Sequence, residues 1–214
     1  MSKELSPTAS FLRSDTKQQL RELIADHCPD YANVLTLAGP FGRDARLLIE
    51  RKHAKVTSIE HSKRIFRTQV RNTKGKSAFT PIKGEVNEVL PILVKHYPPF
   101  EVVFLDFCGP YGPANEKSLE TVISSKLLLK NGLLAITFMI GREARLNDTR
   151  LCTQFLEQGT KGYLENRVLS IEAMIQHLAR ESRTRYSPLI KPLVYRNRKQ
   201  EATEMMLFFY KRVK

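Results

Sequence analysis

Cysteine is scarce in this chain, with three in 214 residues. Cys28, Cys108 and Cys152 lie far apart in the sequence and never form a Cys-x-x-Cys pair. This pattern argues against a disulfide framework and against a structural zinc site. The five histidines show no metal-ligand spacing either. We therefore expect no structural metal.

Long hydrophobic runs are also absent. No stretch approaches the roughly 18 consecutive apolar residues of a membrane span, so we expect no membrane association. The first residues, Met-Ser-Lys-Glu-Leu, lack the apolar segment of a secretion signal, which favours a cytoplasmic protein. Apolar residues still make up 42% of the chain. That share supports a sizeable core and excludes wholesale disorder.

Negative charge is scarce in two segments, although the whole chain has 22 acidic residues against 35 basic ones and a net charge of +13. Residues 51–76 carry nine Lys or Arg side chains and one acid, Glu60, for a net charge of +8. Residues 180–214 carry ten basic and three acidic side chains, for +7. Clustered positive charge attracts phosphate backbones. We expect RNA or DNA as a partner, although an acidic protein or a simply solvated surface would suit the same charges.

A basic helix is predicted over residues 63–73, in the first of these segments. Its cationic side chains recur at spacings of 4, 4 and 3, so they share one face. Phe66 and Val70 are expected to point into the core instead. A second basic group lies between the last two predicted strands. The side chains expected to bind nucleic acid are Lys63, Arg67, Arg71, Lys74, Arg196, Arg198 and Lys199.

Short apolar runs alternate with helical patterns along the chain. Strands are predicted at 34–37, 55–59, 79–83, 102–105 and 133–140. The strand at 79–83 contains Pro81 and should lie at a sheet edge. One of the intervening helices is expected over 115–129, ended by Asn131-Gly132. Two more apolar stretches, 190–195 and 205–210, predict a terminal antiparallel hairpin.

This alternation predicts an α/β fold. We expect a doubly wound, mostly parallel seven-stranded sheet with a C-terminal antiparallel hairpin and helices on both faces. No linker or repeat divides the chain, so residues 1–214 are expected to form a single domain. Within it, 1–30 should be a helical extension, 31–140 the ligand-binding core, and 141–214 helices and the hairpin.

Small and acidic residues follow the first three predicted strands, where ligands bind in such sheets. Ala38-Gly39-Pro40-Phe41-Gly42 follows the first strand, and its small residues permit a sharp turn and close approach of a ligand. Glu60-His61 follows the second, where an acid can accept hydrogen bonds from both hydroxyls of a ribose. Gly84-Glu85-Val86 follows the third and could frame an adenine edge, although it also suits an ordinary helix start.

The residues after the fourth strand, Asp106-Phe107-Cys108-Gly109-Pro110-Tyr111-Gly112-Pro113, predict a shaped loop that holds the reaction site. Asp106 could accept a hydrogen bond from a substrate amine, and Phe107 or Tyr111 could stack on a planar base. Cys108 offers an alternative as a covalent nucleophile on a pyrimidine ring. A capped turn with packed aromatics is the structural alternative. The candidate catalytic residues are Asp106, Cys108 and Tyr111.

At these positions the chain resembles the class I, Rossmann-like methyltransferases that use S-adenosylmethionine. The resemblance covers about Ala32 to Met139, and the terminal hairpin agrees with it. In that family, the loop after the first strand faces the methionine part of the cofactor, and the loop after the fourth faces the substrate. Acids after the second and third strands lie near the ribose and the adenine. The resemblance therefore assigns cofactor binding to Ala38, Gly39, Pro40, Phe41, Gly42, Glu60, His61, Gly84, Glu85, Val86 and Asp106.

The resemblance implies an S-adenosylmethionine-dependent methyltransferase, and the basic segments favour a nucleic-acid base as its target. A base in a duplex would first have to be flipped out.

The chain departs from the family at Thr36, where an acid is usual, and at Ala38 and Pro40, where glycines are usual. A non-catalytic nucleic-acid-binding module is therefore the alternative function. A nicotinamide dehydrogenase would need G-x-G-x-x-G, which is absent. The methylated atom and the oligomeric state stay open.

Overall fold

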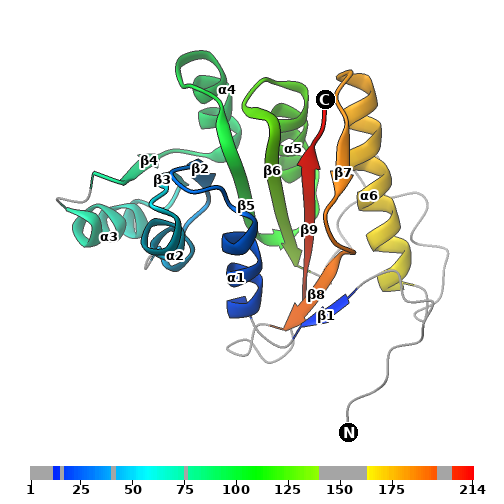
Figure 1. Cartoon of the computed structure of the whole chain (residues 1–214), viewed down its shortest axis with the longest axis horizontal. Coiled ribbons are helices and arrows are strands. Elements are labelled where there is room, and N and C mark those ends of the chain that lie inside the picture. Colours follow the sequence, from blue (N-terminus) through cyan, green and yellow to red (C-terminus); the bar gives the residue numbers. More distant parts are fainter. Residues whose placement is uncertain (1–11, 15–16, 40–41, 75–76, 140–162, 197–203) are drawn as a thin grey trace, which may run out of the picture.

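A mostly parallel sheet covered by helices on both faces forms the fold (Figure 1). The computed structural model describes residues 12–14, 17–39, 42–74, 77–139, 163–196 and 204–214. Within them, nine strands form one sheet in the order β1-β8-β9-β6-β5-β2-β3-β4, with β7 also paired to β9. This architecture confirms the predicted α/β class.

The elements alternate along the described chain. The strands are β1 (Leu12–Ser14), β2 (Asn33–Thr36), β3 (Lys55–Glu60), β4 (Phe79–Lys83), β5 (Phe100–Pro110), β6 (Leu128–Met139), β7 (Tyr186–Pro188), β8 (Leu193–Arg196) and β9 (Glu204–Arg212). The helices are α1 (Lys17–His27), α2 (Arg43–Lys52), α3 (Lys63–Thr73), α4 (Val86–His96), α5 (Pro113–Ser124) and α6 (Tyr163–Glu181). None of these helices combines the length and the apolar character needed to cross a bilayer.

All seven predicted strands are present in the sheet. Strands β2 to β6 pair in parallel with one another, and β9 runs antiparallel between β6 and β8 as the terminal hairpin requires. Strand β4, which contains Pro81, lies at one end of the sheet as predicted. Two strands of three residues each were not predicted: β1 beside β8, and β7, which continues the β8 edge along β9.

The helix predicted over 115–129 is shorter in the structure. Helix α5 ends at Ser124, and Leu128 already begins β6. Asn131 adopts a left-handed backbone with φ 66°, inside a bulge that lies between the pairs Phe100–Leu128 and Val102–Leu133. A Cβ on Gly132 would lie 2.9 Å from the Glu101 carbonyl oxygen. The Asn-Gly pair therefore shapes a strand bulge rather than ending a helix.

Both faces of the sheet are buried at its central strands β2, β5 and β6, which explains the continuous apolar runs of these strands. Leu35 and Leu105 belong to a core cluster with residues of α4, α5 and α6. Their neighbours Val34 and Phe104 belong to a second cluster with residues of α1 and α2. Successive residues of a strand thus serve opposite helical layers.

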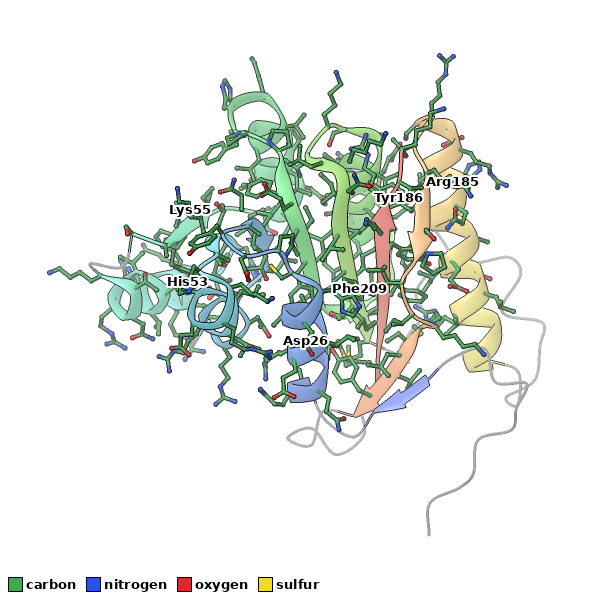
Figure 2. All side chains as sticks on the ribbon, in the orientation of Figure 1. Asp26, His53, Lys55, Arg185, Tyr186 and Phe209 are labelled. Atoms are coloured by element: carbon green, nitrogen blue, oxygen red, sulfur yellow. The ribbon has the colours of Figure 1, made fainter. Side chains whose placement is uncertain are left out.

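Helix α1 packs on the face of the sheet that carries Val34 and Phe104. Leu20, Ile24 and Ala25 are each no more than 2% exposed, and the spacing of Leu20 and Ile24 puts both on one side of the helix. The His27 ring packs edge-on against Phe209 of β9, with ring centroids 5.2 Å apart. Figure 2 labels Phe209 on β9 and Asp26, the residue before His27, on α1. The helix expected as an extension therefore packs into the core.

The strand order places the topological switch point between β2 and β5. From β2 the chain moves outward to β3 and β4, then returns to β5 on the opposite side of β2. Ligands of doubly wound sheets bind beyond the carboxyl ends of the strands at this point.

Candidate functional site

The turn after β2, Glu60 and Asp106, which the sequence predicted as parts of one site, lie at the same edge of the sheet. Strands β3, β2 and β5 are adjacent and parallel, and Thr36 of β2 lies in register with Ser58 of β3 and Phe104 of β5. Parallel strands end on the same side. The turn after β2, Glu60 of β3 and Asp106 of β5 therefore share the carboxyl edge at the switch point.

The turn after β2 needs glycine at one position and leaves space at another. Gly42 has φ +50° and is the N-cap of α2, and its N–H donates to the Gly39 carbonyl at 2.9 Å. A left-handed backbone favours glycine there. Gly39 has no such strain, and among the described residues beyond its chain neighbours a Cβ built on it would meet nothing within 4 Å. The described part of the chain thus leaves space beside Gly39 for a ligand. Pro40 and Phe41 lie outside the described residues.

A buried glutamine of α3 anchors this turn. The Gln69 amide donates to the carbonyl oxygens of Ala38 and Gly39, and the Ala38 N–H donates to Ser58 Oγ at 3.2 Å. Gln69 is 1% exposed, whereas Val70, expected in the core, is 45% exposed. The prediction for Val70 was wrong because α3 turns a polar side chain inward to hold the turn. No sequence pattern pointed to Gln69, because its partners lie about 30 residues away.

Replacing Gln69 with Met should destabilise the protein. The substitution preserves volume but leaves the buried Ala38 carbonyl without its donor, at a cost of about 1–3 kcal/mol in the free energy of unfolding. Urea unfolding measures the change. The neighbouring exposed substitution Val70→Met should stay within about 0.5 kcal/mol. Equal effects of the two substitutions would contradict the anchoring role.

Glu60 is held at the end of β3. Its carboxylate is 9% exposed, and Oε1 accepts a hydrogen bond from the Ser62 N–H at 2.7 Å. Ser62 in turn caps α3, because its Oγ accepts from the Ile65 N–H. His61 is well exposed, with Nδ1 3.5 Å from the Glu60 oxygen. The acid predicted to bind a ribose is thus fixed at the carboxyl edge.

Residues 84–86 lie beside Glu60. The Gly84 N–H donates to the Glu60 carbonyl oxygen at 3.2 Å. A Cβ on Gly84 would come within 2.6 Å of the Val89 side chain, so glycine suits this close approach. Glu85 is exposed at the start of α4, and Val86 packs partly against the core. The structure thus places the Glu85 carboxylate, but not the Val86 side chain, toward solvent.

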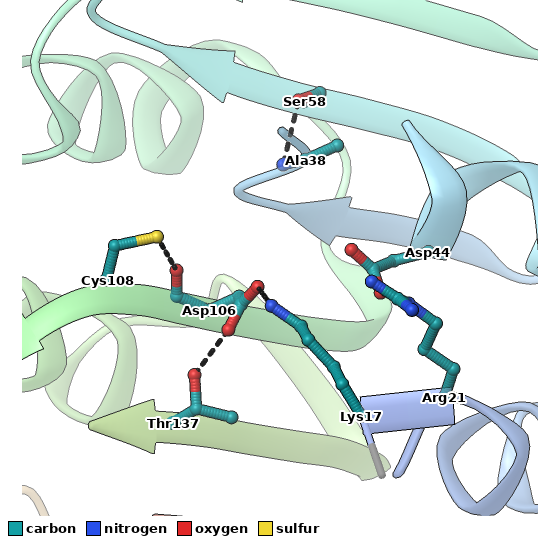
Figure 3. A network of polar contacts seen from close by, with 8 residues as sticks. All are labelled: Lys17, Arg21, Ala38, Asp44, Ser58, Asp106, Cys108 and Thr137. Carbon is teal, nitrogen blue, oxygen red and sulfur yellow. Dashed lines mark hydrogen bonds and ion pairs between the residues drawn. The ribbon is translucent and has the colours of Figure 1, made fainter. Parts of the chain in front are cut away.

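Asp106 lies in a polar cluster on the α1 face of the sheet (Figure 3). The side chain is 6% exposed. Its Oδ1 accepts a hydrogen bond from the Thr137 hydroxyl at 2.6 Å, and its Oδ2 accepts one from Lys17 Nζ at 2.5 Å. Thr137 is the register partner of Asp106 on β6. The sequence pattern did not reveal Lys17, since it precedes Asp106 by 89 residues.

The segment after Asp106 is strand rather than loop. Strand β5 continues to Pro110, which pairs with Met139. Between the pairs Asp106–Thr137 and Pro110–Met139, β5 has three residues where β6 has one. The extra residues form a bulge, which redirects side chains at the edge of a sheet.

The two aromatic residues of this segment belong to the core. Phe107 stacks on Phe138 with ring centroids 5.4 Å apart, and Tyr111 meets the same ring edge-on at 5.2 Å. Tyr111 is 1% exposed, and its hydroxyl donates to Glu116 at 3.0 Å. The packed-aromatic alternative is therefore the one observed. Neither ring presents a face on which a substrate base could stack.

Raised pKa values keep Lys17 charged and the Cys108 thiol protonated. Burial alone would lower the pKa of Lys17, but the Asp106 carboxylate and its hydrogen bond outweigh burial and raise it. The ammonium group therefore stays charged. The Cys108 residue is exposed as a whole, yet desolvation of its sulfur and the nearby Asp106 charge raise the pKa of the thiol. A thiol held protonated is a poor nucleophile, which disfavours the covalent alternative.

A second ion pair lies next to the glycine turn. Arg21 Nε donates to Asp44 Oδ1 at 2.5 Å, and both side chains are largely buried. Asp44 lies in the first turn of α2, directly after Gly42 and Arg43. Thr36, where the methyltransferase family has an acid, is fully buried, and its hydroxyl has no hydrogen-bond partner within the described part of the chain.

The basic side chains of α3 face solvent. Lys63, Arg67 and Arg71 of the helix and Lys74 at its C-cap are all exposed, as the helical spacing predicted. The helix begins three residues after Glu60, so this face starts at the carboxyl edge. Arg198 and Lys199 lie outside the described residues. Arg196 is the last residue of β8, but the structure does not describe its side chain.

Comparison with known proteins supports the fold and leaves the sequence without a matching relative. No protein-family model matches the chain, and no curated protein matches it by sequence. Trm5b from Pyrococcus abyssi is similar over 92% of this chain and 48% of its own, with a TM-score of 0.62 and 14% identity. The chain thus spans about half the length of Trm5b.

Two further solved structures agree. The fibrillarin pre-rRNA processing protein of Methanococcus jannaschii is similar over 86% of this chain and 68% of its own, with a TM-score of 0.53 and 14% identity. TYW2 from P. horikoshii, solved in complex with MeSAdo, is similar over 97% and 64%, with a TM-score of 0.58 and 11% identity. The chain has the Rossmann-like fold of the class I methyltransferases.

Proposed function

We propose that this chain, with its class I methyltransferase fold, transfers a methyl group from S-adenosylmethionine to RNA. One observation carries the proposal: an open glycine turn, a fixed acid at Glu60 and a buried carboxylate at Asp106 share the carboxyl edge at the switch point. This combination provides a place for an adenosyl group beside a group that can orient an acceptor.

The residues present fit the cofactor. The open space beside Gly39 admits a ligand against the main chain, and Gln69 holds that main chain in place. The Glu60 carboxylate is suited to the ribose hydroxyls, and the exposed Glu85 carboxylate to the adenine amine. When bound, S-adenosylmethionine supplies an electrophilic methyl group on its sulfonium. The buried Thr36 takes no part in this set.

Alignment is the main contribution that the protein has to make to methyl transfer. Thr137 and Lys17 each donate to one oxygen of Asp106, which fixes the carboxylate plane. A carboxylate has about four lone-pair sites, so Asp106 can accept a further hydrogen bond. We assign it the acceptor amine of the substrate, which it would orient toward the methyl group.

RNA is the proposed substrate because of the charge on α3 and one structural neighbour. The exposed face of Lys63, Arg67 and Arg71 suits a phosphate backbone and begins close to Glu60. Fibrillarin, which shares the fold, is named as a pre-rRNA processing protein. Both observations support RNA over protein as the methyl acceptor.

A transfer assay with tritiated S-adenosylmethionine across RNA, DNA and protein pools tests the function. We expect label in the RNA pool. The alternative, a non-catalytic nucleic-acid-binding module, predicts RNA binding with no label in any pool. Label in protein alone would overturn the assignment of the substrate.

Replacing Gly39 with Val should block cofactor binding without unfolding the protein. The new side chain would fill the open space beside the turn, and the backbone there tolerates a Cβ. We expect S-adenosylmethionine affinity, measured by equilibrium dialysis, to fall at least about tenfold, a loss of about 1.4 kcal/mol. Gly109→Val is the matched control, since a Cβ on Gly109 also meets nothing within 4 Å in the part of the chain that the structure describes. Equal losses in both variants would refute a pocket at Gly39.

A further inference from the structure

We propose that α1 is part of the site and that its two cations position different halves of it. Lys17 positions Asp106 for the acceptor, and Arg21 positions the glycine turn through Asp44. The inference rests on the proposed methyltransferase function, because it assigns each cation to one step of that reaction.

The two ion pairs come from one side of one helix. Lys17 and Arg21 are four residues apart, so they lie on the same face of α1, one turn from each other. Lys17 Nζ lies 2.5 Å from Asp106 Oδ2, and Arg21 Nε lies 2.5 Å from Asp44 Oδ1 (Figure 3). Asp106 belongs to β5, on the acceptor side, whereas Asp44 lies in the first turn of α2, just after the glycine turn. One helix therefore connects both halves.

The helix is rigid enough to serve as a support. Leu20 and Ile24 are buried in the core cluster beneath α2, so α1 cannot move without exposing them. Fixing a long cationic side chain costs conformational entropy. Because the backbone of α1 is already ordered by its packing, only the side chains of Lys17 and Arg21 have to be fixed. The partners are also largely buried, where ion pairs are screened less than at the surface.

Lys17 is well suited to fix Asp106. The ionisable groups around the carboxylate are Lys17 of α1, Asp44 of α2, Cys108 of β5 and Tyr195 of β8. Burial and the Asp106 charge raise the pKa of Tyr195, and the thiol of Cys108 is held protonated. Lys17 thus faces Asp106 as a cation among groups that are neutral or acidic. Its loss would leave Thr137 as the remaining donor within the described part of the chain.

The two cations should have separable kinetic signatures. In Lys17→Met, we expect kcat to fall about 100-fold, the effect of a misplaced reacting group, with the KM for S-adenosylmethionine within about twofold of the native value. Lys17→Arg should restore at least about a tenth of the lost rate, because a charged donor is kept. In Arg21→Met, we expect the Kd for S-adenosylmethionine to rise about tenfold, with kcat at saturation within about threefold.

Arg51→Met is the matched control. Arg51 of α2 pairs with Asp26 of α1 at 2.7 Å, but both side chains are exposed. Its loss should change neither parameter. The full chain is assayed with tritiated S-adenosylmethionine and the RNA pool that accepts the methyl group from the native protein. Thermal unfolding is monitored for every variant. If Lys17→Met does not fold, Lys17→Gln takes its place with the same expected separation of kcat from KM.

The outcomes separate the positioning roles from the proposed function. If the native protein is active but the Lys17 and Arg21 variants keep native kinetics, or if each variant changes kcat and Kd by similar factors, the positioning roles alone are overturned. A native protein that does not bind S-adenosylmethionine, or that binds it and transfers no methyl group, overturns the proposed function, and the inference with it.

Discussion

Replacing Asp106 with Asn will abolish methyl transfer while S-adenosylmethionine binding persists. The amide keeps the shape of the side chain but loses the charge that pairs with Lys17 and the acceptor capacity that orients a substrate amine. We expect kcat to fall by at least about 100-fold, with the Kd for the cofactor within about twofold. Initial rates on RNA and equilibrium dialysis measure the two quantities.

Cys108→Ser supplies the control for that experiment. Its thiol lies beside Asp106 but is held protonated, so its loss should leave the rate nearly unchanged. A rate lost with Cys108 and kept with Asp106→Asn would favour the covalent alternative. Full activity in Asp106→Asn alone would show that the site is misplaced.

Reversing Arg67 and Arg71 to Glu together will weaken RNA binding and flatten its dependence on salt. Both side chains are exposed on one face of α3. Each arginine that no longer neutralises a phosphate lowers the slope of log K against log salt by about 1, so the slope should fall by about 2. At about 0.1 M salt we expect at least a tenfold loss of affinity. Filter binding across a salt series measures both.

Lys126→Glu with Lys130→Glu is the matched charge reversal. Both lysines are exposed, but they flank the amino-terminal end of β6, on the opposite edge of the sheet from Glu60. This variant carries the same change in net charge and should bind RNA nearly as the native protein does. An equal loss in both double variants would indicate that net charge, and not the α3 face, governs binding.

The fold could be predicted because its signals are local. The central parallel strands β2, β5 and β6 are largely buried and therefore appear as short apolar runs, and Pro81 marks an edge because it cannot donate to a neighbouring strand. The carboxyl ends of β2, β3 and β5 then meet as a consequence of parallel pairing. The positions of the glycine turn, Glu60 and Asp106 at one edge followed from that rule.

The contacts that shape the site could not be predicted in the same way. Lys17 with Asp106 and Gln69 with Ala38 join residues far apart in the sequence, and periodicity gives a helix face without naming its partner. The expectation that Tyr111 could stack on a substrate base was wrong for a related reason. An aromatic residue next to a turn suits either a stacking surface or the core, and only packing against Phe138 decides between them. The bulge after Asp106 likewise depends on register with β6.

The carboxyl edge between the glycine turn, Glu60 and Asp106 is expected to bind S-adenosylmethionine, and every step proposed for the site depends on that binding. Calorimetric titration of the native chain with S-adenosylmethionine tests it most directly. We predict saturable heat with one site per chain, and none with a nicotinamide dinucleotide. A titration without heat from S-adenosylmethionine would contradict the claim and leave a binding module that shares the methyltransferase fold.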